Sequence, residues 1–175
     1  MQIVIRAIAR FVVTLRLRKS KFDEQSFSTA LGKSRSFLVL MPENEEDFKY
    51  AVDILSFLRE LKKEITVLTY DYCVSSLPLP FRGTAIGHGI KDINKINLPS
   101  LGMIKKISRK NFDALLDLNI KEQLYYAYVT AIANTGLRIG FKKKLSDKLY
   151  NLQISNDETN PKISYKNLLN CLKML

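Results

Sequence analysis

Polar residues that could bind a ligand follow one apolar segment of the chain. Asp117 and Asn119 come at the end of the run from Phe112 to Leu118, which predicts a buried β-strand. Open α/β sheets bind ligands at the carboxyl ends of their strands, so this pair is a candidate binding site. Asn119 has a second interpretation of equal weight, as the cap of the helix that follows.

The other residue types that carry chemistry form no recognisable site. His88 is the single histidine and lies in a Gly-His-Gly stretch, where we expect a flexible loop residue. Cys73 and Cys171 are far apart in the sequence and form no CxxC pair, which indicates a reduced, intracellular chain. No serine or cysteine has an evident base, and residues 83–89 lack the P-loop pattern. We therefore predict neither a metal nor a cofactor.

An acidic cluster follows the first strong strand signal. Residues 43–47 read Glu-Asn-Glu-Glu-Asp and come directly after Pro42. Proline and carboxylates are favoured in the first turn of a helix, where negative charge meets the positive end of the helix dipole. The simplest interpretation is that this cluster begins a helix.

Alternating strand and helix patterns must position these residues. Apolar runs predict strands at 36–41, 65–70, 112–118 and 137–141, with shorter strands near 84–86 and 149–154. Helical spacing predicts helices over 42–63, 101–107, 122–134 and 165–175, and Thr135-Gly136 predicts a C-terminal helix stop. A strand–helix–strand order predicts parallel strands. We therefore expect a three-layer, Rossmann-like α/β domain with a mostly parallel sheet over residues 36–175.

Residues 1–35 form a basic N-terminal arm. They contain eight basic and two acidic residues, a net +6 of the chain's +11. Val4, Ile8, Val12 and Leu15 recur at helical spacing and predict the apolar face of an amphipathic helix, although residues 13–18 also alternate like a strand. Residues 20–35 are rich in serine and lysine and predict a linker or an irregular arm.

The helix of this arm has two open interpretations. It could be an interfacial anchor on an anionic membrane surface, or it could pack against another subunit or against the sheet. The candidate docking residues in either case are basic, namely Arg6, Arg10, Arg16, Arg18 and Lys19.

The hydropathy and charge of the chain limit its expected cellular location and its expected partners. No segment has the roughly 20 apolar residues that a membrane span needs, and the apolar start is interrupted by arginines, so we expect no signal peptide. The pI of about 9.6 favours an anionic partner. No RNA- or DNA-binding motif accompanies the charge, which makes nucleic acid the weakest candidate. We expect a cytoplasmic protein, or one held peripherally on the inner face of the membrane.

Three segments together resemble the N-terminal half of the family 9 glycosyltransferases, the heptosyltransferases of lipopolysaccharide assembly. They are the strand and helix from Val39 to Leu58, the Phe-Asp-Ala-Leu-Leu-Asp-Leu segment that starts at Phe112, and the Leu-Arg-Ile-Gly-Phe segment that starts at Leu137, with Tyr150-Asn151 after it. The resemblance covers about residues 37–175. It implies one half of a GT-B fold, the half that binds the acceptor.

The resemblance also implies roles for individual residues. Asp47 matches the aspartate that is thought to act as general base on the acceptor hydroxyl in that family, and Glu46 stands where the family has glycine. The residues that would bind the acceptor are Asp117, Asn119, Arg138, Lys142, Lys143 and Lys144.

Two functions follow as hypotheses. The family's sugar-nucleotide domain is absent from the chain, so the resemblance implies a domain that acts in, or derives from, sugar transfer to a membrane glycolipid. Such a domain would lack activity alone and would need a separate donor-domain protein. The alternative is a non-enzymatic subunit that kept the fold and docks through its basic arm on a membrane or a larger protein assembly. Whether the chain is an enzyme stays open at this point.

Overall fold

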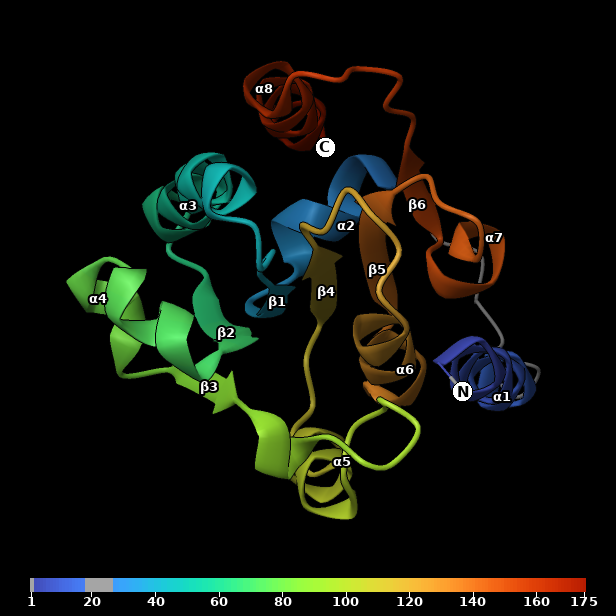
Figure 1. The fold of residues 1–175 in the computed structure, drawn as a ribbon. Helices are drawn as coiled ribbons and strands as arrows, with labels where there is room; N and C mark the ends of the chain where they lie inside the picture. The colour runs from blue at the N-terminus through green and yellow to red at the C-terminus, as the bar shows by residue number, and fades with distance from the viewer. Residues whose placement is uncertain (1, 18–26) are drawn as a thin grey trace.

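The computed structural model describes residues 2–17 and 27–175, which form a three-layer α/β fold around one sheet (Figure 1). The sheet has six strands in the order β3-β2-β1-β4-β5-β6, and each neighbouring pair is parallel. The predicted Rossmann-like α/β class is therefore confirmed. In chain order the strands are β1 (Ser36–Leu40), β2 (Glu64–Tyr70), β3 (Ala85–His88), β4 (Ala114–Asp117), β5 (Leu137–Phe141) and β6 (Leu152–Ile154).

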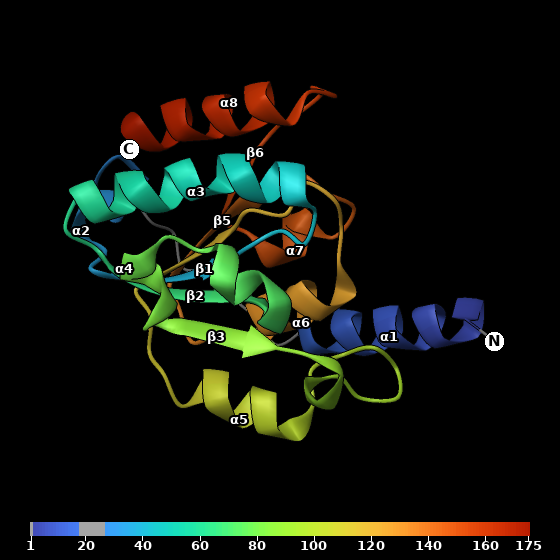
Figure 2. The same cartoon turned by 60° about the vertical axis from the view of Figure 1, so that its left-hand side comes forward.

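Helices cover both faces of the sheet. Figure 2 shows α3 and α8 stacked on one side, with α5 on the other. The α-helices are α1 (Gln2–Leu17), α2 (Phe27–Lys33), α3 (Glu45–Glu60), α4 (Leu79–Arg82), α5 (Leu101–Ser108), α6 (Leu124–Ile132), α7 (Ser146–Leu149) and α8 (Pro161–Lys173). Two 3-10 helices, η1 (Asp71–Ser76) and η2 (Ile90–Asp92), complete the elements of the described segments.

The central strand shows why its sequence is continuously apolar. Phe37 and Val39 of β1 pack into the cluster formed with α3 and α8, whereas Leu38 and Leu40 pack into the cluster formed with α5 and α6. Successive side chains of a strand point to opposite faces, and here both faces are covered. Each residue of β1 after Ser36 is therefore buried.

Helix α1 packs beside α6 with the face opposite to its predicted apolar face. Its buried residues are Ala9, Val13 and Leu17, which join a third cluster with Ala127 of α6. The predicted apolar face points outward, since Val4, Ile8 and Leu15 are exposed and Val12 is partly buried. Ala9 and Ala127 are both buried in this cluster, and the larger side chains of Val4, Ile8 and Leu15 lie outside it.

Three further local predictions are corrected. The segment 20–35, predicted as a linker, contains α2 over its described part, because Leu31 is buried in the main core; residues 18–26 lie outside the described residues. The strand predicted over 149–154 starts only at Leu152, since Leu149 closes α7. Helix α6 ends at Ile132 with an extended cap residue, and no glycine of the described segments has a positive φ, so Gly136 is not a left-handed helix stop.

Candidate functional site

The sheet reverses its winding direction between β1 and β4. From β1 the chain builds β2 and β3 on one side, and it then returns to build β4, β5 and β6 on the other. Parallel α/β sheets bind ligands outside the carboxyl ends of the strands at such a point. A cavity of about 320 Å³, the switch-point crevice, lies there and is lined by Pro42, Glu43, Asn44, Asp47, Asn119, Ile120, Lys121 and Gln123.

One wall of the crevice is the first turn of α3. Asn44 caps this helix, because its side-chain oxygen accepts a hydrogen bond from the backbone N–H of Asp47 at 3.1 Å. Glu45, Glu46 and Asp47 occupy the first turn, as expected for carboxylates at the positive end of a helix. Burial raises the pKa of Asp47, Lys121 opposes the shift, and Glu46 adds to it. The helix terminus already carries its own negative charge, which disfavours a phosphate ligand.

Asp117 is buried two residues before Asn119, and both of its carboxylate oxygens accept hydrogen bonds from other side chains. It is 2% exposed and accepts hydrogen bonds from Lys143 Nζ at 2.8 Å and from the Tyr150 hydroxyl at 2.5 Å. Its second oxygen accepts from the Asn119 side-chain Nδ2 at 2.7 Å. Burial, followed by the Asp117 charge, raises the pKa of Tyr150. Asp117 therefore braces the ends of β4 and β5 and does not line the crevice.

Asn119 is the residue of the predicted pair that does reach the crevice. It does not cap α6, because the N-cap of α6 is Gln123, with no side-chain cap bond. Its Nδ2 donates to Asp117 and, at 3.4 Å, to the carbonyl oxygen of Leu40. Its Oδ1 is buried and has no hydrogen-bond partner among residues 2–17 and 27–175. The structure thus brings Asp47 and Asn119 to one cavity.

The other predicted binding residues lie elsewhere. Arg138 is buried near the start of β5, where its guanidinium donates to the carbonyl oxygen of Ala133 at 3.1 Å. Of the three consecutive lysines, Lys142 and Lys144 are exposed, and Lys143 turns inward to Asp117 and to the backbone carbonyl of Asn119. The structure therefore does not bring Arg138 or the exposed lysines to the crevice.

A larger groove adjoins the crevice on the side of β2. Its volume is about 920 Å³, and it shares Glu43 and Asn44 with the crevice. The groove runs between the start of α3 and η1, where the Tyr72 hydroxyl donates to the carboxylate of Glu43 at 2.8 Å. The other lining residues are Glu45, Glu46, Phe48, Lys49, Val52, Cys73 and Ser76. This end of the sheet is therefore acidic at its rim and partly apolar inside.

His88 is an internal residue of the fold, which corrects its interpretation as a flexible loop residue. It ends β3 at 1% exposure, stacks on Tyr125 with ring centroids 4.4 Å apart, and places Nε2 3.0 Å from the Tyr126 hydroxyl. Burial lowers its pKa to about 4. The signal was present in the sequence, since His88 lies two residues after the buried Ile86 and so falls on the same strand face.

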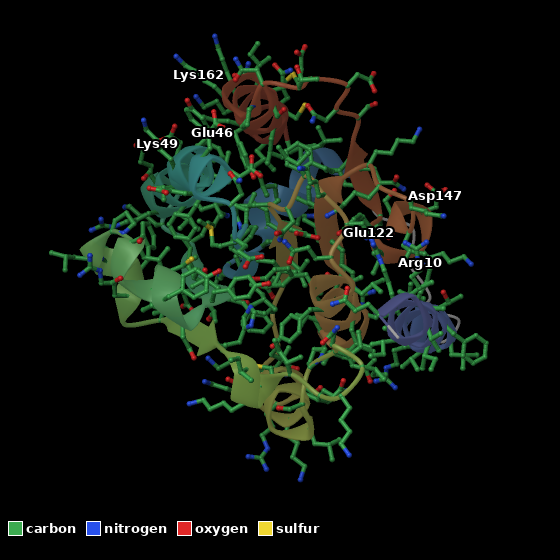
Figure 3. All side chains as sticks on the ribbon, in the orientation of Figure 1. Arg10, Glu46, Lys49, Glu122, Asp147 and Lys162 are labelled. Atoms are coloured by element: carbon green, nitrogen blue, oxygen red, sulfur yellow. The ribbon has the colours of Figure 1, made fainter. Side chains whose placement is uncertain are left out.

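The outer surface of α1 carries a second candidate interface. Ile3, Val4, Ile8, Phe11 and Leu15 are exposed by 86%, 60%, 47%, 63% and 40%. We call these five residues the α1 stripe. Arg6 and Arg16 are exposed on the same helix, whereas Arg10 forms an ion pair with Glu122, just before α6 (Figure 3). Arg18 and Lys19 lie outside the described residues.

Within the described ranges, two other kinds of site are not seen. No group of three or more histidine, cysteine, aspartate or glutamate side chains is arranged to hold a metal ion. No helix there is both long and apolar enough to span a bilayer.

Fold and surface together define a Rossmann-like domain that has an acidic switch-point crevice and an amphipathic N-terminal helix. The chain belongs to the Family of unknown function (DUF6913), which matches residues 10–175. No curated protein matches the chain. Family membership does not bear on the resemblance to the family 9 glycosyltransferases, which stays a prediction.

Proposed function

We propose that this protein is a non-enzymatic docking subunit that attaches to an anionic membrane surface through α1. The observation that carries the proposal is the α1 stripe, a row of large apolar side chains that the fold leaves in solvent. Contiguous exposed apolar surface on a globular domain marks a site of protein or membrane contact.

The spacing of the stripe suits a helix that lies flat on a surface. Val4, Ile8, Phe11 and Leu15 recur at intervals of four, three and four residues, which places them on one side of an α-helix. They extend over about 17 Å of helix length. The opposite face of α1 is seated on the domain through Ala9, Val13 and Leu17. Docking through the stripe therefore leaves the domain intact.

The charge of the chain favours a membrane over a protein partner. The formal net charge is +11, and Arg6 and Arg16 are exposed on α1 itself. Basic side chains near an anionic leaflet each contribute roughly 1 kcal/mol of binding, and long arginine side chains can reach headgroups while the apolar face sinks in. Interfacial helices combine these two features.

The crevice gives less support to sugar transfer. Asp47 does line it, but the loop between β1 and α3 contains no glycine, and Glu43 of that loop is followed by Glu45 and Glu46 in the first turn of α3. Asp117, the second predicted polar residue, is already bonded to Lys143 and Tyr150. These observations favour docking over catalysis as the function of the domain.

Vesicle co-sedimentation of the full chain tests the proposal. Phosphatidylcholine vesicles with and without phosphatidylserine are compared for the natural chain and for Ile8→Ser/Phe11→Ser. We expect binding only to the anionic vesicles, and a loss of at least about tenfold in the double variant.

The matched control is Leu79→Ser/Ile90→Ser, which removes two large exposed apolar side chains elsewhere, at 77% and 93% exposure. This control should bind like the natural chain. If both double variants bind equally well, or if the natural chain ignores anionic vesicles, α1 is not a membrane anchor.

A further inference from the structure

We infer that the switch-point crevice and the adjoining groove bind an aliphatic polyamine, with one ammonium group in the crevice. The inference is independent of the docking function, because it concerns acidic residues of the chain and not the basic residues of α1. The chain has 28 basic and 17 acidic residues, yet four of the acids fall within residues 43–47. Two of them, Glu43 and Asp47, line the crevice itself.

A buried acceptor in the crevice wall lacks its donor. Asn119 lines the crevice at 2% exposure, and its Oδ1 has no partner in the part of the chain that the structure describes. The orientation of the amide is fixed, because its Nδ2 donates to two acceptors, Asp117 Oδ1 and the Leu40 carbonyl oxygen. If the amide were flipped, its oxygen would face both of these acceptor oxygens, and neither hydrogen bond could form. Buried polar atoms are nearly always paired, so this one calls for a donor from outside the fold.

The chemistry of the lining selects an ammonium ion. The crevice lining has two carboxylates, Glu43 and Asp47, against one cation, Lys121. The carboxylates and the amide oxygen are acceptors, and an ammonium group brings three N–H donors together with positive charge. An anion would meet Glu43 and Asp47 at a helix end whose first turn is already acidic. A metal ion is less suited, since no cluster of three or more metal-type side chains occurs in residues 2–17 and 27–175. Burial raises the pKa of Asp47 even though Lys121 opposes the shift, and a bound cation would oppose it further.

The adjoining groove indicates how long the ligand is and how many positive charges it carries. It continues from the crevice through the shared Glu43 and Asn44, and it has apolar lining from Phe48 and Val52. Glu45 and Glu46 add acceptors farther along, against one lysine, Lys49. Methylene segments between separated ammonium groups match a groove that is lined by both acidic and apolar side chains. A polyamine fits both cavities better than a single small amine.

The test is titration of the full chain with spermidine, followed by calorimetry and by the side-chain amide NMR signal of Asn119. The crevice variant is Glu43→Gln/Asp47→Asn, and the control is Glu60→Gln/Glu64→Gln, which removes the same charge at exposed positions outside both cavities. We expect saturable binding that shifts the Asn119 signal, weakened at least tenfold in the crevice variant and unchanged in the control. Urea unfolding of both variants tests whether each of them is folded.

Two outcomes of the spermidine titration overturn the inference. One is the absence of saturable spermidine binding by the natural chain. The other is an equal loss in the crevice variant and the control, which would show diffuse attraction to the whole surface. A further arm replaces spermidine with 1,8-octanediol, which has a similar apolar chain and no charge. Binding of the diol with equal strength would also exclude recognition of ammonium groups.

Discussion

Lys143 Nζ lies 2.8 Å from Oδ2 of Asp117, and the two side chains are 6% and 2% exposed. Tyr150 and Asn119 complete the bonding of the same carboxylate. The pair joins the end of β4 to the segment after β5, next to the crevice. A buried ion pair is costly to break from one side, because the remaining charge is left without a partner.

We therefore predict that Lys143→Met lowers the free energy of unfolding by about 3–5 kcal/mol. Urea denaturation of the full chain measures it. Lys142→Met and Lys144→Met are matched controls, since both neighbours are exposed, and each should change stability by less than about 0.5 kcal/mol. Adding Asp117→Asn to Lys143→Met should recover part of the loss. Equal effects for the three lysines would show that the pair is not a stabilising contact.

The close packing of Gly140 against Tyr150 gives a second prediction. A Cβ at Gly140 would lie 2.7 Å from the Tyr150 ring, whereas one at Gly102 in α5 would meet nothing nearer than 3.8 Å. Gly140→Ala should therefore destabilise the fold by about 1–3 kcal/mol through overpacking. Gly102→Ala should be neutral or stabilise by up to about 1 kcal/mol, because alanine favours a helix. Thermal unfolding compares the two, and the reverse order would contradict the packing at β5.

The seating of α1 can be tested with two leucines on the same helix. Leu17 is 3% exposed and Leu15 is 40% exposed. Leu17→Ala should cost about 2–3 kcal/mol of stability, and Leu15→Ala should cost well under 1 kcal/mol. Chemical denaturation gives both values. If the two losses are alike, α1 is not seated on its Ala9, Val13 and Leu17 face.

His88 predicts a loss of stability on acidification. Burial lowers its pKa from 6.5 to about 4, with Asp71, Asp92 and Glu43 opposing the shift. Between these values the unfolded chain binds a proton that the folded chain does not, so stability falls as the pH falls from 6.5 towards 4. The full loss is about 3 kcal/mol.

The comparison of the natural chain with His88→Phe isolates this contribution from that of the carboxylates. Unfolding free energies are measured at several pH values between 7 and 4 in urea. The phenylalanine variant loses the contact with the Tyr126 hydroxyl and is less stable at neutral pH, but its stability should fall less steeply. Parallel curves would mean that His88 titrates normally in the folded protein.

Much of the fold could be predicted because the sheet is buried on both faces. Continuous apolar runs such as Phe37 to Met41 and Leu137 to Phe141 are distinctive, and the strand–helix alternation then requires parallel pairing. The face of α1 could not be predicted, because both of its sides are apolar. The buried side is the one that carries Ala9, Val13 and Leu17, and its cluster with Ala127 of α6 forms only in the folded chain.

The site was predicted in part. Asp117 and Asn119 were placed correctly at the carboxyl end of β4, but their separate roles depend on Lys143 and Tyr150, which follow in sequence after another strand. Nothing in Lys142-Lys143-Lys144 distinguishes the inward lysine from its exposed neighbours, because the distinction is set by the turn after β5. His88 was misjudged because its two flanking glycines outweighed the strand periodicity.

The sheet order also has a consequence for synthesis on the ribosome. Strand β1 pairs with β2 soon after both emerge, but its other neighbour is β4, and Ser36 is joined to Asp113 across 77 residues. Until β4 has left the exit tunnel, one edge of the most apolar strand stays open in the nascent chain. Such an unpaired edge is a site where chains aggregate, and it is the kind of surface that chaperones protect. The middle of this sheet is therefore closed late, after more than two thirds of the chain has been made.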